Sequence, residues 1–166
     1  IRRVGEMSMS EYDLNGRVVI MTGAGRGLGK AMTEALTEAG ANVVAAAHID
    51  NDFPELEAAC ADNPGKIHCV TADIRESEDC DRIVAEGLDA FGAIHGLVNN
   101  AGLTFTYIWP DGHKRPEWEA TGEMPKFYEA SDEVVQNVMN ANFVGGDKLA
   151  RRVAPLMIEQ GWGRII

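Results

Sequence analysis

The sequence predicts an α/β fold in which a parallel sheet is doubly wound, with helices on both faces. Short apolar runs alternate along the chain with longer segments of helical periodicity, which is the pattern of repeated βαβ units. Runs such as Val18–Met21 show no alternation with polar residues, as expected for strands that are buried on both faces. The first of them passes directly into a glycine-rich turn that opens a helix. Together these three observations indicate a nucleotide-binding type of α/β domain.

Composition and charge limit the classes of protein. The chain has 166 residues, of which 45% are hydrophobic and 25% are charged, as is ordinary for one globular domain. We expect residues 17–166 to form this domain and residues 1–16 to be an irregular leader. The formal net charge of −11 argues against nucleic acid and against an anionic membrane as partners. No apolar run approaches the roughly 20 residues that span a bilayer.

The cysteines indicate a reducing compartment. Cys60, Cys69 and Cys80 are odd in number and too far apart to form a CxxC pair. Reduced thiols in a cytoplasmic protein are therefore the expected state. No metal site is expected.

A phosphate-binding turn is predicted between the first strand and the first helix. The apolar run Val18–Met21 leads into Thr22, then into glycine at every second position from 23 to 29, and then into a helix that ends near Gly40. Glycine lets the backbone turn sharply and lets a phosphate approach the amides, and the start of the helix offers free N–H groups. We assign cofactor binding to the residues of this turn, which are Gly23, Ala24, Gly25, Arg26, Gly27, Leu28 and Gly29.

The spacing of these glycines excludes two common motifs. A Walker-type loop would need glycine at Ala24 and a hydroxyl at Ala31, and a GxGxxG fingerprint would need glycine at Leu28 or Lys30. The pattern that fits is Thr-Gly-x-x-x-Gly-x-Gly, beginning at Thr22. The alternative is a glycine-rich strand-to-helix turn that binds nothing.

The second and third strands also end in polar residues. Asn42–Ala47 is predicted as a strand that is followed by His48 and Asp50, and Ile67–Ala72 as a strand that is followed by Asp73 and Ile74. In a dinucleotide-binding fold, an acid after the second strand binds the ribose hydroxyls and a base accepts a 2′-phosphate. The alternative for His48 and Asp50 is an ordinary solvated loop, and Asp73 alone would be a helix cap. Helices are expected over 53–61 and 76–91.

The fourth strand, Ile94–Val98, runs into Asn99, Asn100, Ala101 and Gly102. We expect Asn99 to hydrogen-bond the neighbouring central strand. The next three residues are expected to form a flat floor without bulk.

In this order, the glycine turn, the Asp-Ile pair and the Asn-Asn-Ala-Gly run resemble the N-terminal part of the short-chain dehydrogenase/reductase family. The resemblance implies a Rossmann-type fold that binds NAD(P). It implies that the Asp73 carboxylate takes the adenine amino group and that Ile74 packs on the adenine ring. It places Asn100, Ala101 and Gly102 beneath the ribose and nicotinamide.

The resemblance also bears on the choice of cofactor. NAD-preferring members carry Asp at the position of Ala47 in this chain. His48 and Arg26 fall where NADP-preferring members often carry basic residues. The sequence therefore leans slightly towards NADP. Asp50 would reach the adenosine ribose of the cofactor only if the loop after the second strand is one or two residues longer than assumed.

A long helical stretch begins at Ser131, and its expected apolar side is formed by Val134, Val138, Phe143, Leu149, Val153 and Leu156. Asn142 and Gly145 match the Asn-x-x-Gly of the family, in which Asn sits at a helix break and its main-chain carbonyl holds a water of the proton relay. Gly145 and Gly146 allow close packing, and Pro155 predicts a kink. In relatives this helix lies in a subunit interface, so the resemblance implies a homodimer or homotetramer.

Between these motifs lies an insertion at about 103–130 that holds six of the eleven aromatic residues and three of the six prolines. Loops of this length are usually functional or disordered, and aromatic content disfavours disorder. One hypothesis is that the insertion covers the substrate pocket beside the nicotinamide. An alternative of equal weight is that the insertion packs on the surface of the domain or takes part in a subunit contact.

At the end of the sequence, residues 163–166 are expected to begin a fifth strand. In the family, the fifth strand leads to the catalytic Ser, and a Tyr-x-x-x-Lys pair follows later. Neither is found in this sequence, and none of its three tyrosines has Lys four residues on. We therefore expect these residues to be an incomplete part of a longer enzyme, with the sheet truncated at the start of strand five. That enzyme would interconvert an alcohol and a ketone by hydride transfer with NAD(P). The alternative is a non-catalytic dinucleotide-binding module that senses redox state or assembles with a partner.

Overall fold

The computed structural model describes residues 13–103, 128 and 130–166. The predictions for the leader up to residue 12 and for most of the 103–130 insertion, the proposed pocket cover included, lie outside these residues. Residues 13–16 form a turn that is tied to the end of the first helix, since the Leu14 amide donates to the Ala39 carbonyl (3.0 Å).

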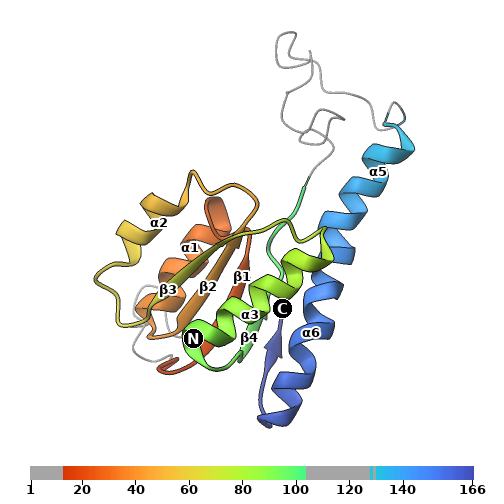
Figure 1. The fold of residues 1–166 in the computed structure, drawn as a ribbon. Coiled ribbons are helices and arrows are strands. Elements are labelled where there is room, and N and C mark those ends of the chain that lie inside the picture. The colour runs from red at the N-terminus through yellow and green to blue at the C-terminus, as the bar shows by residue number, and fades with distance from the viewer. Residues whose placement is uncertain (1–12, 104–127, 129) are drawn as a thin grey trace, which may run out of the picture.

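Five parallel strands form one sheet in the order β3-β2-β1-β4-β5 (Figure 1). The strands are β1 (Val18–Thr22), β2 (Asn42–Ala47), β3 (Ile67–Thr71), β4 (Gly96–Val98) and β5 (Arg164–Ile165). The chain builds outward from β1 to β3 and then returns to place β4 on the other side of β1. This reversal confirms the predicted doubly wound, Rossmann-type fold.

Helices cover both faces of the sheet (Figure 1). The helices are α1 (Gly27–Glu38), α2 (Phe53–Cys60), α3 (Ser77–Phe91), α5 (Asp132–Met139) and α6 (Gly145–Glu159). On one face, α1 and α2 pack over sheet side chains such as Met21 and Val43, and α2 contributes Leu56 to this cluster. On the other, α3 and α6 pack over side chains such as Ile20 and Val44. Because β1 and β2 contribute side chains to both clusters, their residues form continuous apolar runs in the sequence.

A π-helical segment, η3 (Asn140–Val144), joins α5 to α6. It confirms the predicted break in the helix at Asn142, and π-turns of this kind often mark functional sites. The prediction for Phe143 is wrong, because its side chain is 65% exposed. Phe143 comes nine residues after the buried Val134, which is two and a half turns of about 3.6 residues each, so it lies on the opposite face of the helix. The side chains buried along η3 and α6 are Ala141, Leu149, Val153 and Met157.

The close approach predicted for the glycine pair is confirmed. A Cβ at Gly145 would lie 2.8 Å from the Ile74 carbonyl oxygen, and one at Gly146 would lie 3.2 Å from the Asn99 side chain. The start of α6 is therefore pressed against the ends of β3 and β4. Beyond it, α6 continues as one helix through Pro155. Among the described residues, no helix is long and apolar enough to cross a membrane.

Candidate cofactor-binding site

The carboxyl ends of β1, β2, β3 and β4 lie along one edge of the sheet, and the predicted site residues follow them. The sheet order reverses between β1 and β4, since β1 pairs with β2 on one side and with β4 on the other. The crevice outside such a reversal is where open α/β sheets bind ligands. The glycine turn follows β1 at this point, and residues 99–102 follow β4.

The glycine turn brings the backbone of β1 against the start of α1. Gly23 and Gly27 have φ angles of 66° and 57°, which favour glycine. A Cβ at Gly29 would lie 2.0 Å from the Gly23 carbonyl oxygen, so the close packing requires glycine there. Around Gly27 the space that a Cβ would enter is open. Leu28 is 78% exposed, which leaves this corner of the turn facing outward.

The start of α1 provides amide donors. Arg26 occupies the N-cap and makes no side-chain capping bond within the described part of the chain. The first N–H groups of a helix have no partner inside it, and the helix dipole attracts negative charge there. The open cradle and the uncapped helix start fit a phosphate of the expected cofactor. Ala24 anchors the turn to the sheet, because its side chain is fully buried and its amide donates to the Ala46 carbonyl (3.1 Å).

Asn100 holds the glycine turn to the end of β4. Its side-chain amide donates to the carbonyls of Thr22 (2.9 Å) and Gly23 (3.2 Å). The buried Thr22 hydroxyl accepts from the main-chain amides of Asn100 and Ala101 (both 3.0 Å) and donates to the Val98 carbonyl (3.2 Å). These five hydrogen bonds tie β1 to β4 across the reversal of the sheet.

The structure corrects the assignment of the two asparagines. The bond to the central strand, predicted for Asn99, is made by Asn100 instead. Asn99 is exposed, its amide donates to the Ile166 carbonyl (2.8 Å) and its side chain lies beside Gly146. Successive side chains after a strand point to opposite sides, so a shift of one residue exchanges the two roles.

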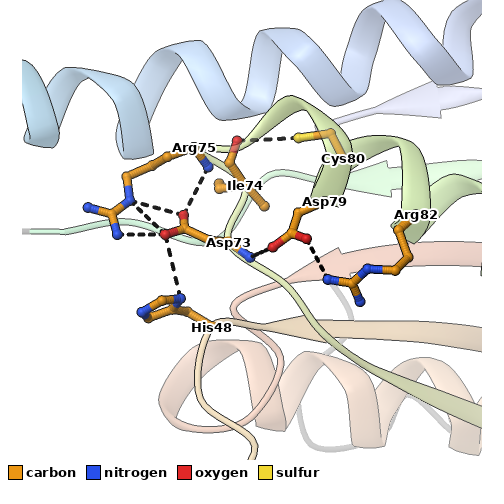
Figure 2. Close-up of polar contacts among 7 residues, drawn as sticks. All are labelled: His48, Asp73, Ile74, Arg75, Asp79, Cys80 and Arg82. Carbon is orange, nitrogen blue, oxygen red and sulfur yellow. Dashed lines mark hydrogen bonds and ion pairs between the residues drawn. The ribbon is translucent and has the colours of Figure 1, made fainter.

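At the end of β3, Asp73 lies between the Arg75 guanidinium and the His48 ring (Figure 2). Arg75 Nε lies 3.0 Å from Asp73 Oδ1 and Arg75 Nη2 lies 2.5 Å from Oδ2. The main-chain amide of Arg75 donates to the same carboxylate (3.0 Å), and His48 Nδ1 lies 3.6 Å from it. Burial alone would raise the pKa of Asp73, but the bonds and charge of Arg75, helped by His48, lower it below its usual value. Asp73 is therefore a fixed carboxylate at the strand end, where the adenine contact was predicted.

The turn that carries Asp73 is fastened to α3 and α6. The Asp73 amide donates to the Asp79 carboxylate (2.6 Å), and the Cys80 thiol donates to the Ile74 carbonyl (3.3 Å) (Figure 2). From α6, Lys148 Nζ donates to the Arg75 carbonyl (2.5 Å). Ile74 is 8% exposed and belongs to the core, where it lies beside Gly145 at the start of α6.

The loop after β2 places its charged residues differently from the prediction. His48 lies beside Asp73, and the Asp50 side chain is exposed. Asp52 lies over the glycine turn, with its carboxylate 3.9 Å from Arg26 Nε. Asp52 had no signal in the sequence beyond its place in an acidic loop, because only the folded loop shows which acid turns back.

Asn142 lies at the same edge, in the π-helical segment. Its side-chain oxygen accepts from the Leu103 amide (2.6 Å), and its side-chain nitrogen donates to the Leu103 carbonyl (2.8 Å). Gly102 lies alongside, since a Cβ there would be 3.4 Å from the Asn142 oxygen. The structure thus brings the predicted relay residue next to the predicted floor.

Three contributors to this site were missed by sequence reasoning: Thr22 as a side-chain anchor, Arg75 and Asp52. A signal existed for Arg75, because Asp followed two residues later by a donor is an Asx-turn pattern. In the described ranges, no group of three or more acidic, His or Cys side chains could hold a metal ion.

The fold and this edge define a Rossmann-type α/β protein with a glycine-rich turn at the reversal of its sheet. The profile of the short chain dehydrogenase family matches residues 17–166. The chain belongs to the short-chain dehydrogenase/reductase family, as the resemblance predicted.

Individual relatives agree with this assignment. The chain is 29% identical over 153 residues to a ketoacyl reductase of Nostoc sp., covering 92% of this chain and 47% of the relative. It is 28% identical over 153 residues to a 3-oxoacyl-[acyl-carrier-protein] reductase of Thermotoga maritima, covering 92% and 55%. A metagenomic short-chain oxidoreductase solved in complex with NADP has a TM-score of 0.74 at 25% identity, with 92% and 62% covered. The chain spans about half the length of the curated relatives that it matches.

Proposed function

We propose that the protein containing this chain is an NAD(P)-dependent oxidoreductase that interconverts an alcohol and a ketone. The observation that carries the proposal is the uncapped start of α1 above a glycine cradle, at the point where the sheet order reverses. Two relatives are named as reductases of ketoacyl or oxoacyl groups, and a structural relative was solved with NADP. These names support a carbonyl substrate and a nicotinamide cofactor.

The cofactor, when bound, supplies or accepts the hydride. Residues of this chain would hold it: the amides at the start of α1 would bind phosphate, and Asp73 would accept a hydrogen bond from the adenine amino group. Asn142 would act as a positioning residue for the proton relay. Its side chain makes two hydrogen bonds to the main chain of Leu103, and these bonds fix the π-helical main chain next to Gly102.

Fluorescence titration of the full-length protein with NADH and NADPH tests this function, using a pair of matched variants. Gly27→Ala places a methyl group in the open cradle and strains a positive φ of 57°. Gly92→Ala strains a φ of 78°, also with open space around it, at the far end of α3. We expect Gly27→Ala to weaken binding by roughly tenfold or more and Gly92→Ala to leave binding unchanged.

The two candidate functions then separate by turnover with a ketone. Binding of either cofactor without hydride transfer would support the alternative, a non-catalytic dinucleotide-binding module. Binding of neither cofactor would exclude both.

We also propose that the protein is a homodimer or homotetramer in the cytoplasm. Val135, Met139 and Phe143 are spaced by four residues and are 41%, 47% and 65% exposed, which gives α5 and η3 an apolar outer stripe. A subunit interface would bury such a stripe. Met139→Glu should shift the assembly towards monomer in sedimentation experiments, whereas Gln136→Glu, which adds the same carboxylate to a polar position of α5, should not.

A further inference from the structure

The N-cap residue of α2 turns away from its own helix. Asp52 occupies this position, where an Asp side chain ordinarily accepts a hydrogen bond from the second or third helical amide. It makes no capping bond to α2. One reason is local, because Pro54 lies at the second position of the helix and has no amide to donate.

The Asp52 carboxylate lies against the glycine turn instead. A Cβ at Gly25 would lie 3.1 Å from Asp52 Cβ and 3.4 Å from Asp52 Oδ2. This is tighter than ordinary contact, so a side chain at Gly25 would require Asp52 to move. The Asp52 side chain is 37% exposed, so it is partly accessible to a ligand.

The same corner contains the end of β2. The Cβ built at Gly25 would lie 3.8 Å from the Ala47 methyl group, so Gly25 faces both Ala47 and Asp52. After the second strand, dinucleotide-binding folds place an acid for the ribose hydroxyls or a base for a 2′-phosphate. At Ala47 this chain has neither, and Asp52 supplies a carboxylate to that corner from the next element along the chain.

The positive charge of the nearest basic side chain, Arg26, is balanced by the Asp52 carboxylate. Arg26 Nε lies 3.9 Å from Asp52 Oδ2, and the Arg26 side chain is 72% exposed. A ribose with free hydroxyls can donate to the carboxylate, whereas a 2′-phosphate would meet its negative charge. We propose that Asp52 is the residue that selects NAD over NADP. This inference rests on the proposed function, because it assumes that the glycine turn binds a dinucleotide.

This proposal is opposite to the slight preference for NADP that Arg26 and His48 indicated in the sequence. The structure places His48 3.6 Å from the Asp73 carboxylate and places Arg26 beside Asp52. Each of the two bases that favoured a 2′-phosphate thus faces an acid. The tertiary arrangement leaves a carboxylate where the ribose is read.

Titration of the full-length protein with NADH and with NADPH, followed by fluorescence, tests the proposal. The wild type is expected to bind NADH more tightly. Asp52→Asn should weaken the binding of NADH and strengthen the binding of NADPH. The ratio of their dissociation constants should shift by roughly tenfold or more. Asp52→Glu keeps the charge and should keep the preference for NADH.

Asp50→Asn is the matched control, because it removes the same charge from the same loop at an exposed side chain. It should leave the ratio unchanged. An unchanged ratio in Asp52→Asn, or an equal shift in Asp50→Asn, would overturn the role of Asp52 while leaving the proposed function standing. Failure of the wild type to bind either cofactor would overturn both.

Discussion

Asn100 allows the sharpest test of how the site is built, because its neighbour Asn99 provides an internal control. The Asn100 side chain donates to two carbonyls of the turn after β1, at 2.9 and 3.2 Å. Replacement by Ala removes both bonds at a partly buried position. At about 1 kcal/mol for each net hydrogen bond, we expect a loss of about 2 kcal/mol in the free energy of unfolding. Asn99→Ala removes an exposed side chain and should cost less than about 0.5 kcal/mol.

Equilibrium unfolding in urea of the full-length protein measures this difference. With a denaturant slope of about 2 kcal/mol/M, Asn100→Ala should lower the midpoint by about 1 M. Asn100→Asp should be worse than Ala, since it places a carboxylate against two carbonyl oxygens. Equal losses in the Asn99 and Asn100 variants, or no loss at Asn100, would refute the assignment of the anchor.

Two further predictions concern the other anchors of this edge. Arg75→Met should lower stability near neutral pH by about 1–3 kcal/mol and raise the pKa of Asp73. Because the folded-state pKa of Asp73 is lowered, this contribution is present above the unfolded value of about 3.9 and is lost as pH falls through the folded value. Denaturation at pH 7 and pH 3 should therefore show a difference that shrinks in acid, whereas Arg151→Met, in an exposed ion pair, should have little effect at either pH. An equal loss at both pH values would point to packing rather than charge. Thr22→Val should cost about 2–3 kcal/mol in the same assay, because it leaves two amides without their acceptor, and Thr22→Ser, which keeps the hydroxyl, should recover most of it.

Much of the fold could be predicted because its information is local. Apolar runs of strand length and the residues that follow them are visible along the chain, and all five predicted strands agree with the structure to within two residues. The Phe143 error was one of spacing, because nine residues after Val134 a helix has turned to its opposite face. The exchange of Asn99 and Asn100 is a shift of one residue after β4, where successive side chains point to opposite sides.

The sequence by itself determined the family, the doubly wound sheet and the position of the glycine turn, because spacing constraints on glycine and apolar residues act within a few positions of the chain. Only the tertiary structure decided which side chains meet at the edge of that sheet. Asn100 reaches the turn after β1, and Asp52 lies against Gly25 instead of capping its own helix. Such contacts depend on how loops close between elements 20 to 80 residues apart, and a long-range pairing of this kind leaves no period in the sequence.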